Sequence, residues 1–252
     1  MSQLPDPASE EISVVLVGSL NPAIFHPEWF VRQGLLSLGE ADRAETVVIS
    51  PQVADVRFPD FGLQVLPGRL SVRTSDVSKA PRIHDLIIGI LTKLSHTPVS
   101  AAGLNQSLHI ATEGEENWHK IGDALAPKGL IWGKLYERPG LLNISIQSPR
   151  KGSFPGTTNI TVQPSALITP GVMVTSNIEF RTADQVGSAP KVVEFVQNEW
   201  STAIKEATQV AELIFSEILW QQTTSSFSHT LQRPPTAIRT RLWRPRFAIM
   251  SC

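Results

Sequence analysis

The hydrophobic positions of the chain follow strand-like and helix-like spacings in turn. An apolar run at residues 12–17 predicts a strand buried on both faces of a sheet, and a short helix is expected to begin near Pro27. Four β-like segments follow, most of them ended by a proline: residues 46–50, 52–58, 61–66 and 69–75. From Pro81, isoleucine and leucine side chains at helical spacing predict a helix that ends before Pro98.

The second half of the sequence repeats this order of elements. Residues 102–111 alternate in side-chain character and predict a strand, and Thr112 with Glu115 matches a capping box at the start of the next helix. Four more β-like segments come next, at residues 130–136, 141–147, 157–163 and 172–181. The last helix is expected from Pro190 to about residue 221, about 45 Å long at a rise of about 1.5 Å per residue.

A short motif recurs at the same place in both halves. The pattern Arg-Thr-x-Asp, followed by Ala-Pro and a basic residue, occurs at residues 73–82 and again at residues 181–191 with one residue inserted. This predicts a duplicated unit of strand, helix, four strands and helix, although a chance similarity between two strand-to-helix junctions is the alternative. The repeats are expected at 12–98 and 99–222, between a flexible lead (1–11) and a disordered Arg/Pro-rich tail (223–252).

The predicted fold class is α+β, with one antiparallel sheet shared by the two halves and the helices packed on one of its faces. The order of elements resembles the duplicated unit of the TATA-box-binding protein fold. The resemblance concerns element order alone, and the chain shares no family motif. It therefore implies an architecture and no functional residues.

The candidate binding surface is the sheet face turned away from the helices. Strand alternation is expected to send Leu142, Ile144 and Ile146 toward the helices, so their neighbours face outward. In the second half the residues predicted to face outward are rich in uncharged amides and hydroxyls: Asn105, Ser107, His109, Asn143, Ser145, Gln147, Asn159, Thr161, Gln163, Thr175 and Asn177. Exposed strands often carry charged side chains, so this composition predicts a surface for a polar polymer, a partner protein or a second copy. An ordinary solvated sheet is the alternative.

Composition restricts the class of partner. With 252 residues, 41% hydrophobic and 18% charged, the chain is expected to fold. The net charge of −1 hides five arginines in residues 228–252, which leave 17 basic residues against 23 acids elsewhere. The acidic body argues against nucleic-acid binding except through the tail. The tail itself is expected to be a disordered arm for anionic partners or RNA, a segment that folds on a partner, or a nonfunctional extension.

No catalytic or metal-binding signature stands out in the sequence. The chain has no P-loop, no glycine-rich dinucleotide motif, no Gly-x-Ser-x-Gly and no paired-histidine zinc motif. We therefore predict a non-enzymatic binding or regulatory protein that uses its sheet face, without cofactor or metal. The alternatives are an enzyme with a site in the crease between the halves and a nucleic-acid-binding protein that uses the tail.

The sequence also gives an expectation for location. The single cysteine, Cys252, excludes an internal disulfide. The first eleven residues lack the basic region of a secretory signal, and the apolar run at residues 12–17 is too short to cross a bilayer. These features predict a cytoplasmic protein without membrane contact.

Overall fold

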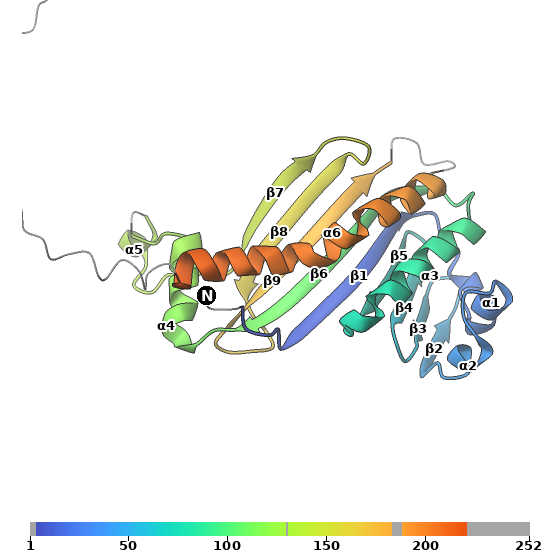
Figure 1. Cartoon of the computed structure of the whole chain (residues 1–252), viewed down its shortest axis with the longest axis horizontal. Coiled ribbons are helices and arrows are strands. Elements are labelled where there is room, and N and C mark those ends of the chain that lie inside the picture. The colour runs from blue at the N-terminus through green and yellow to red at the C-terminus, as the bar shows by residue number, and fades with distance from the viewer. Residues whose placement is uncertain (1–3, 130, 183–187, 221–252) are drawn as a thin grey trace, which may run out of the picture.

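The computed structural model describes residues 4–129, 131–182 and 188–220. These residues form an α+β fold with one nine-stranded antiparallel sheet and six α-helices. Two of the helices, α3 and α6, lie across the same face of the sheet (Figure 1). The fold class and the shared sheet predicted from the sequence are therefore confirmed.

The elements follow the chain in two groups. The first group is β1 (Ser9–Gly18), α1 (Pro27–Arg32), α2 (Leu38–Ala41), β2 (Thr46–Ile49), β3 (Ala54–Arg57), β4 (Gly62–Leu66), β5 (Arg69–Thr74) and α3 (Ala80–Lys93). The second group is β6 (Val99–Ala111), α4 (Gly114–Leu125), α5 (Trp132–Leu135), β7 (Ile144–Arg150), β8 (Gly156–Pro164), β9 (Gly171–Arg181) and α6 (Ala189–Phe215). β1 begins inside the segment expected to be a flexible lead, and the predicted tail lies outside the described residues.

The sheet is organised around its two central strands. The strand order is β2-β3-β4-β5-β1-β6-β9-β8-β7, so β1 and β6 lie side by side and each half extends outward from one of them. β1 and β6 are paired from Ser9 to Gly18, with one register irregularity after Val17. The hydrogen bonds between these two strands make the sheet continuous from one half to the other.

The prediction of a fourth strand in the second half is wrong. Among the described residues of segment 130–136, Trp132 to Leu135 form α5 and pair with no strand, and residue 130 lies outside the description. Gly133 interrupts this stretch and Pro139 and Gly140 follow it, and these residues do not favour a regular strand. After its first strand, the second half thus has three strands where the first half has four. The duplication and the likeness to the TATA-box-binding protein order are not confirmed, and they stay predictions.

The predicted capping box is also wrong. The N-cap position of α4 is Glu113, and its side chain makes no capping hydrogen bond. Thr112 Oγ1 donates instead to the carbonyl of Gly114 at 3.2 Å. Gly114 has φ +81°, a left-handed conformation that turns the chain between Thr112 and the helix. A complete capping box occurs at α2, where Ser37 Oγ accepts from the Glu40 N–H and Glu40 Oε2 accepts from the Ser37 N–H.

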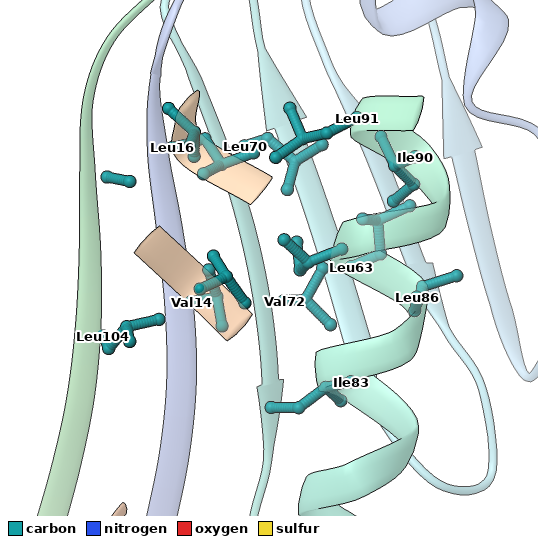
Figure 2. Close-up of a cluster of buried hydrophobic side chains, with 14 of the residues drawn as sticks. Val14, Leu16, Leu63, Leu70, Val72, Ile83, Leu86, Ile90, Leu91 and Leu104 are labelled. Atoms are coloured by element: carbon teal, nitrogen blue, oxygen red, sulfur yellow. The ribbon is translucent and has the colours of Figure 1, made fainter. Parts of the chain in front are cut away.

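The first core lies between α3 and the strands of the first half (Figure 2). The predicted helical stripe is buried against the sheet, and Figure 2 shows these side chains meeting: Ile83, Leu86, Ile90 and Leu91 of α3 with Val14, Leu16, Leu63, Leu70 and Val72 of the strands. The first half of α6 joins this core through Phe195, Val196 and Trp200. Apolar burial of this kind is the main stabilising contribution to a fold.

A second core lies under the far half of α6. Ala207 and Ala211 are fully buried against Leu108 and Val174 of the sheet. Their small side chains let the helix lie close to the strands. The buried Gln106 faces the same helix, where its Oε1 accepts from the Ala207 N–H at 3.0 Å and its Nε2 donates to Thr208 Oγ1 at 2.9 Å. These bonds compensate for burying the amide.

The inward direction predicted for the apolar residues near β7 is only partly correct. Ile144 is half-buried at the margin of the second core, but Ile146 is 59% exposed and Leu142, before the strand begins, is 82% exposed. α6 lies over β6 and β9, while β7 forms the outer edge of the sheet beyond them. The alternation is present, but the helix does not cover this edge.

Candidate binding face of the sheet

The predicted outward-facing residues of the strands lie on the face opposite α3 and α6. Their strand neighbours, such as Leu104, Leu108 and Ile178, are buried under the helices, so alternation places the polar side chains on the other side. Strand register joins them into rows that run across the sheet. The first row, called here the amide row, is Gln147, Asn159, Asn177 and Asn105. The second, called the hydroxyl row, is Ser145, Thr161, Thr175 and Ser107.

The side chains of the amide row form a chain of hydrogen bonds that runs in one direction. Gln147 Nε2 donates to Asn159 Oδ1 at 2.8 Å, and Asn159 Nδ2 donates to Asn177 Oδ1 at 3.3 Å. Asn177 Nδ2 then donates to Asn105 Oδ1 at 2.5 Å, and Asn105 Nδ2 donates to the carbonyl of Ser13 at 3.3 Å. The row therefore links β7, β8, β9, β6 and β1. Each amide has more hydrogen-bonding capacity than these bonds use.

A glycine makes room for the centre of the amide row. Gly103 follows the same alternation as Asn105, two residues before it on β6. A Cβ atom at Gly103 would lie 2.9 Å from Asn177 Nδ2 and 3.9 Å from Asn105 Nδ2. Because no side chain stands there, Asn177 can reach across to β6. The chain of bonds thus depends on a small residue as well as on the amides.

The hydroxyl row is less connected. Ser145 Oγ and Thr161 Oγ1 are 2.9 Å apart and share a hydrogen bond at the edge of the sheet. The remaining predicted residues lie further along the strands. Gln163 and His109 belong to a third row with Met173, and Asn143 is exposed just before β7.

His109 is tied to a loop and not to the two rows. The Nδ1 atom of His109 lies 2.8 Å from Ser165 Oγ. In the same third row, Gln163 places Nε2 3.6 Å from Met173 Sδ. Burial lowers the pKa of His109 below its ordinary value, so the ring is neutral at neutral pH. The structure therefore brings eight of the predicted residues into two neighbouring rows and leaves His109, Gln163 and Asn143 at their border.

A hollow on the same face lies in the first half, where no site was predicted from the sequence. It has a volume of about 630 Å³ and lies over β3, β4 and β5, beside the start of β1. Its charged lining residues are Glu11, Asp55, Arg57, Asp60, Arg69, Arg73 and Asp76. Arg69 and Arg73 could have indicated this hollow from the sequence, because residues four apart on a strand lie on the same face.

Metal sites and membrane-spanning helices have no support among the described residues. In the part of the chain that is described, no group of three or more His, Cys, Asp or Glu side chains is placed to hold a metal ion. None of the helices within the described ranges combines the length and the apolar character needed to cross a membrane. No protein-family model matches the sequence, and no curated protein matches it.

Proposed function

We propose that the protein is a non-enzymatic binding protein that engages a protein partner through the open face of its sheet. The observation that carries the proposal is the amide row, four amides already aligned by one chain of hydrogen bonds. Prealigned side chains lose less conformational entropy when a partner binds. Burying amides and hydroxyls also costs less than burying charges.

The charge distribution around the rows favours a protein partner over nucleic acid. Arg181, the arginine of β9, pairs with Glu179 at 2.5 Å, and the unpaired arginines of this face lie in the hollow of the first half, among carboxylates. The eight residues of the two rows carry no charge. Nucleic-acid affinity depends on several unpaired cations that contact phosphates, whereas the centre of a protein interface is poor in charged residues. Because the chain has a single cysteine, we place this activity in a reducing compartment, the cytoplasm.

The test places charge on the hydroxyl row. The double variant Ser145→Lys/Thr161→Lys adds two ammonium groups beside the amide row without touching the core. The matched control, Ser201→Lys/Thr202→Lys, adds the same charge to the exposed side of α6. Purified tagged protein would be used to recover partners, identified by mass spectrometry, and its mass in solution would be measured by light scattering.

We expect the wild type and the control to recover the same partner in equal amounts. The face variant should recover about a tenth of that amount or less, because charge at an interface carries a like-charge or desolvation penalty. Equal recovery by all three proteins would refute the proposal. A wild-type dimer that only the face variant converts to a monomer would also contradict a separate protein partner, because the face would then bind a second copy.

A further inference from the structure

The hollow continues the amide row into the first half of the sheet. The row ends on β1 at Ser13, and register then leads from Ser13 to Arg73 on β5, to Gly62 on β4 and to Arg57 on β3. Two arginines thus flank one glycine at the floor of the hollow. Neighbouring strands lie about 4.8 Å apart, so the Cα atoms of Arg57 and Arg73 are separated by about 10 Å.

Gly62 has no side chain between the two arginines, and this leaves room for Arg73. The side chain of Arg73 lies across it, with Nε 3.6 Å and Cγ 3.7 Å from the point where a Cβ atom of Gly62 would be. Apart from these atoms, nothing lies within 4 Å of that point. The Nε atom of the exposed Arg73 side chain therefore lies over β4, on the side from which Arg57 also lines the hollow.

The arginines of the hollow lack anionic partners. Across the described residues, Arg57, Arg69 and Arg73 form no ion pair and no side-chain hydrogen bond. Some arginines elsewhere do: Arg82 pairs with Glu40 at 2.9 Å, and Arg150 pairs with Glu199 at 2.6 Å. Unpaired guanidinium groups that line one hollow are ready to bind an anion, and their planar donors suit two oxygens at once.

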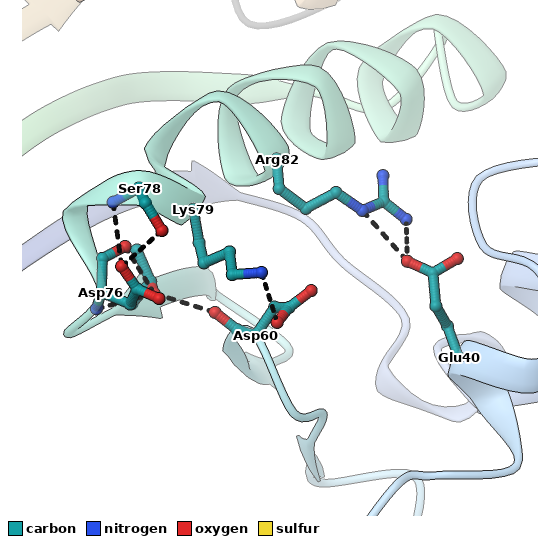
Figure 3. Close-up of polar contacts among 7 residues, drawn as sticks. Glu40, Asp60, Asp76, Ser78, Lys79 and Arg82 are labelled. Carbon is teal, nitrogen blue, oxygen red and sulfur yellow. Dashed lines mark hydrogen bonds and ion pairs between the residues drawn. The ribbon is translucent and has the colours of Figure 1, made fainter.

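Most of the acids that line the hollow are already engaged. Asp55 accepts from Gln64 Nε2 at 3.0 Å, and Asp60 pairs with Lys79 at 3.2 Å. Asp76 accepts from the N–H and the hydroxyl of Ser78, as Figure 3 shows beside the Asp60–Lys79 pair. Glu11 is the one lining acid without a bond among the described residues. Within the described ranges, none of these carboxylates pairs with an arginine of the hollow. Only Asp60 is neutralised by a cation, so the other three oppose a long polyanion more strongly than a single oxyanion.

We infer that the hollow binds a single oxyanion group, a carboxylate or a phosphate, over Gly62 between Arg57 and Arg73. This oxyanion group would belong to the partner bound to the open face, so the inference rests on the proposed function. A carboxylate source would be an acidic side chain of that partner, and a phosphate source a phosphorylated one. Both present oxygens in a geometry that guanidinium groups bind in pairs.

The experiment uses small probes and therefore does not need the partner. Isotope-labelled full-length protein is titrated with sodium succinate or with inorganic phosphate at constant ionic strength, and the arginine Nε–Hε signals are followed by NMR. Arg57→Gln and Arg73→Gln each remove one guanidinium, and Gly62→Val fills the gap with a residue suited to strands. Arg138→Gln is the control, since Arg138 is exposed and lies outside the hollow.

We expect the Arg57 and Arg73 signals of the wild type to shift and saturate as the probe is added. The affinity for the probe should fall by about tenfold or more in the three hollow variants, because a bidentate pair is lost. It should be unchanged in Arg138→Gln. Stronger binding of succinate than of phosphate assigns the group to an acidic side chain, and the reverse order assigns it to a phosphorylated one. Shifts that do not saturate, or that survive in all variants, would overturn the inference. So would equally tight binding of a short single-stranded DNA at the same signals.

The two proposals fail separately. If succinate or phosphate binds while the Ser145→Lys/Thr161→Lys protein keeps its partner, only the proposed function is lost. If that variant loses its partner and neither probe binds the wild type, only the oxyanion site is lost.

Discussion

At the scale of single residues, burial and neighbouring groups shift the pKa values of two glutamates in opposite directions. Burial alone would raise the pKa of Glu40, but hydrogen bonds from Ser37 and Arg82 outweigh it and keep the pKa below its ordinary value. Glu206 on α6 has its pKa raised, first by burial and also by Glu199, against the attraction of Arg150. Its Oε2 is buried without a hydrogen-bond partner. Glu40 therefore stabilises the fold as an anion, whereas ionised Glu206 destabilises it.

The Glu206→Gln variant is predicted to be more stable than the wild type at neutral pH. A carboxyl whose pKa is higher in the folded than in the unfolded protein penalises folding once it must ionise. The penalty is absent below the unfolded pKa, grows as pH rises through the two pKa values and stays constant above them. Thermal unfolding followed by circular dichroism should show a midpoint a few degrees higher near neutral pH and no gain at about pH 4.

The exposed Glu212 of the same helix supplies the control for this prediction. Glu212→Gln removes the same formal charge without relieving a burial penalty. If both variants shift the midpoint equally, or if Glu206→Gln is stabilising at low pH too, the argument from burial fails.

At the scale of elements, spacing predicted well those segments that are long and strongly periodic. Both long helices begin within one residue of the predicted prolines, at Ala80 and at Ala189. The strands with clear alternation, β8 and β9, are also confirmed to within a residue. Segment 130–136 is apolar, but its neighbours in space decide its structure, and nothing in its own sequence shows that a strand partner is missing. Hydrogen bonds along the amide row likewise depend on register between strands.

The amide row is predicted to stabilise the sheet as a unit. Asn177→Ala removes the acceptor for Asn159 and the donor to Asn105, leaving two half-buried amides without these partners. We expect a loss of about 1–2 kcal/mol in the free energy of unfolding, measured by urea denaturation. Thr175→Ala, one row away on the same strand, is the matched control and should cost less, about 0.5 kcal/mol. Equal losses would mean that the row contributes no more than strand propensity.

At the scale of the whole molecule, α6 connects the two cores. Its first half packs in the core under α3, where Trp200 lies 5.0 Å from the ring of His84. Its second half covers the core of β6 and β9, and both cores share the continuous sheet. Since α6 packs in both cores and β1 pairs with β6 across the two halves, we expect the halves to unfold together.

Ala207→Leu is predicted to destabilise both halves at once. Ala207 is fully buried between α6 and the sheet, and its N–H donates to Gln106, so a larger side chain would push the helix away from both. We expect a loss of about 1–3 kcal/mol with a single transition in urea, seen equally by tryptophan fluorescence and circular dichroism. Leu213→Ala, on the exposed side of the helix, should cost about 0.5 kcal/mol or less. Two separate transitions would contradict a shared folding unit.

The sequence by itself determined the periodic elements and the face on which each strand side chain lies, because both follow from backbone geometry that spans only a few residues. It therefore indicated which residues share the polar face, but their alignment into the amide row depends on the register between strands. Only the tertiary structure decided how far that face extends: α6 stops short of β7 and leaves Ile146 exposed, and strand pairing brings Arg57, Gly62 and Arg73 together. Those outcomes depend on contacts between segments far apart in the chain, which local spacing does not encode.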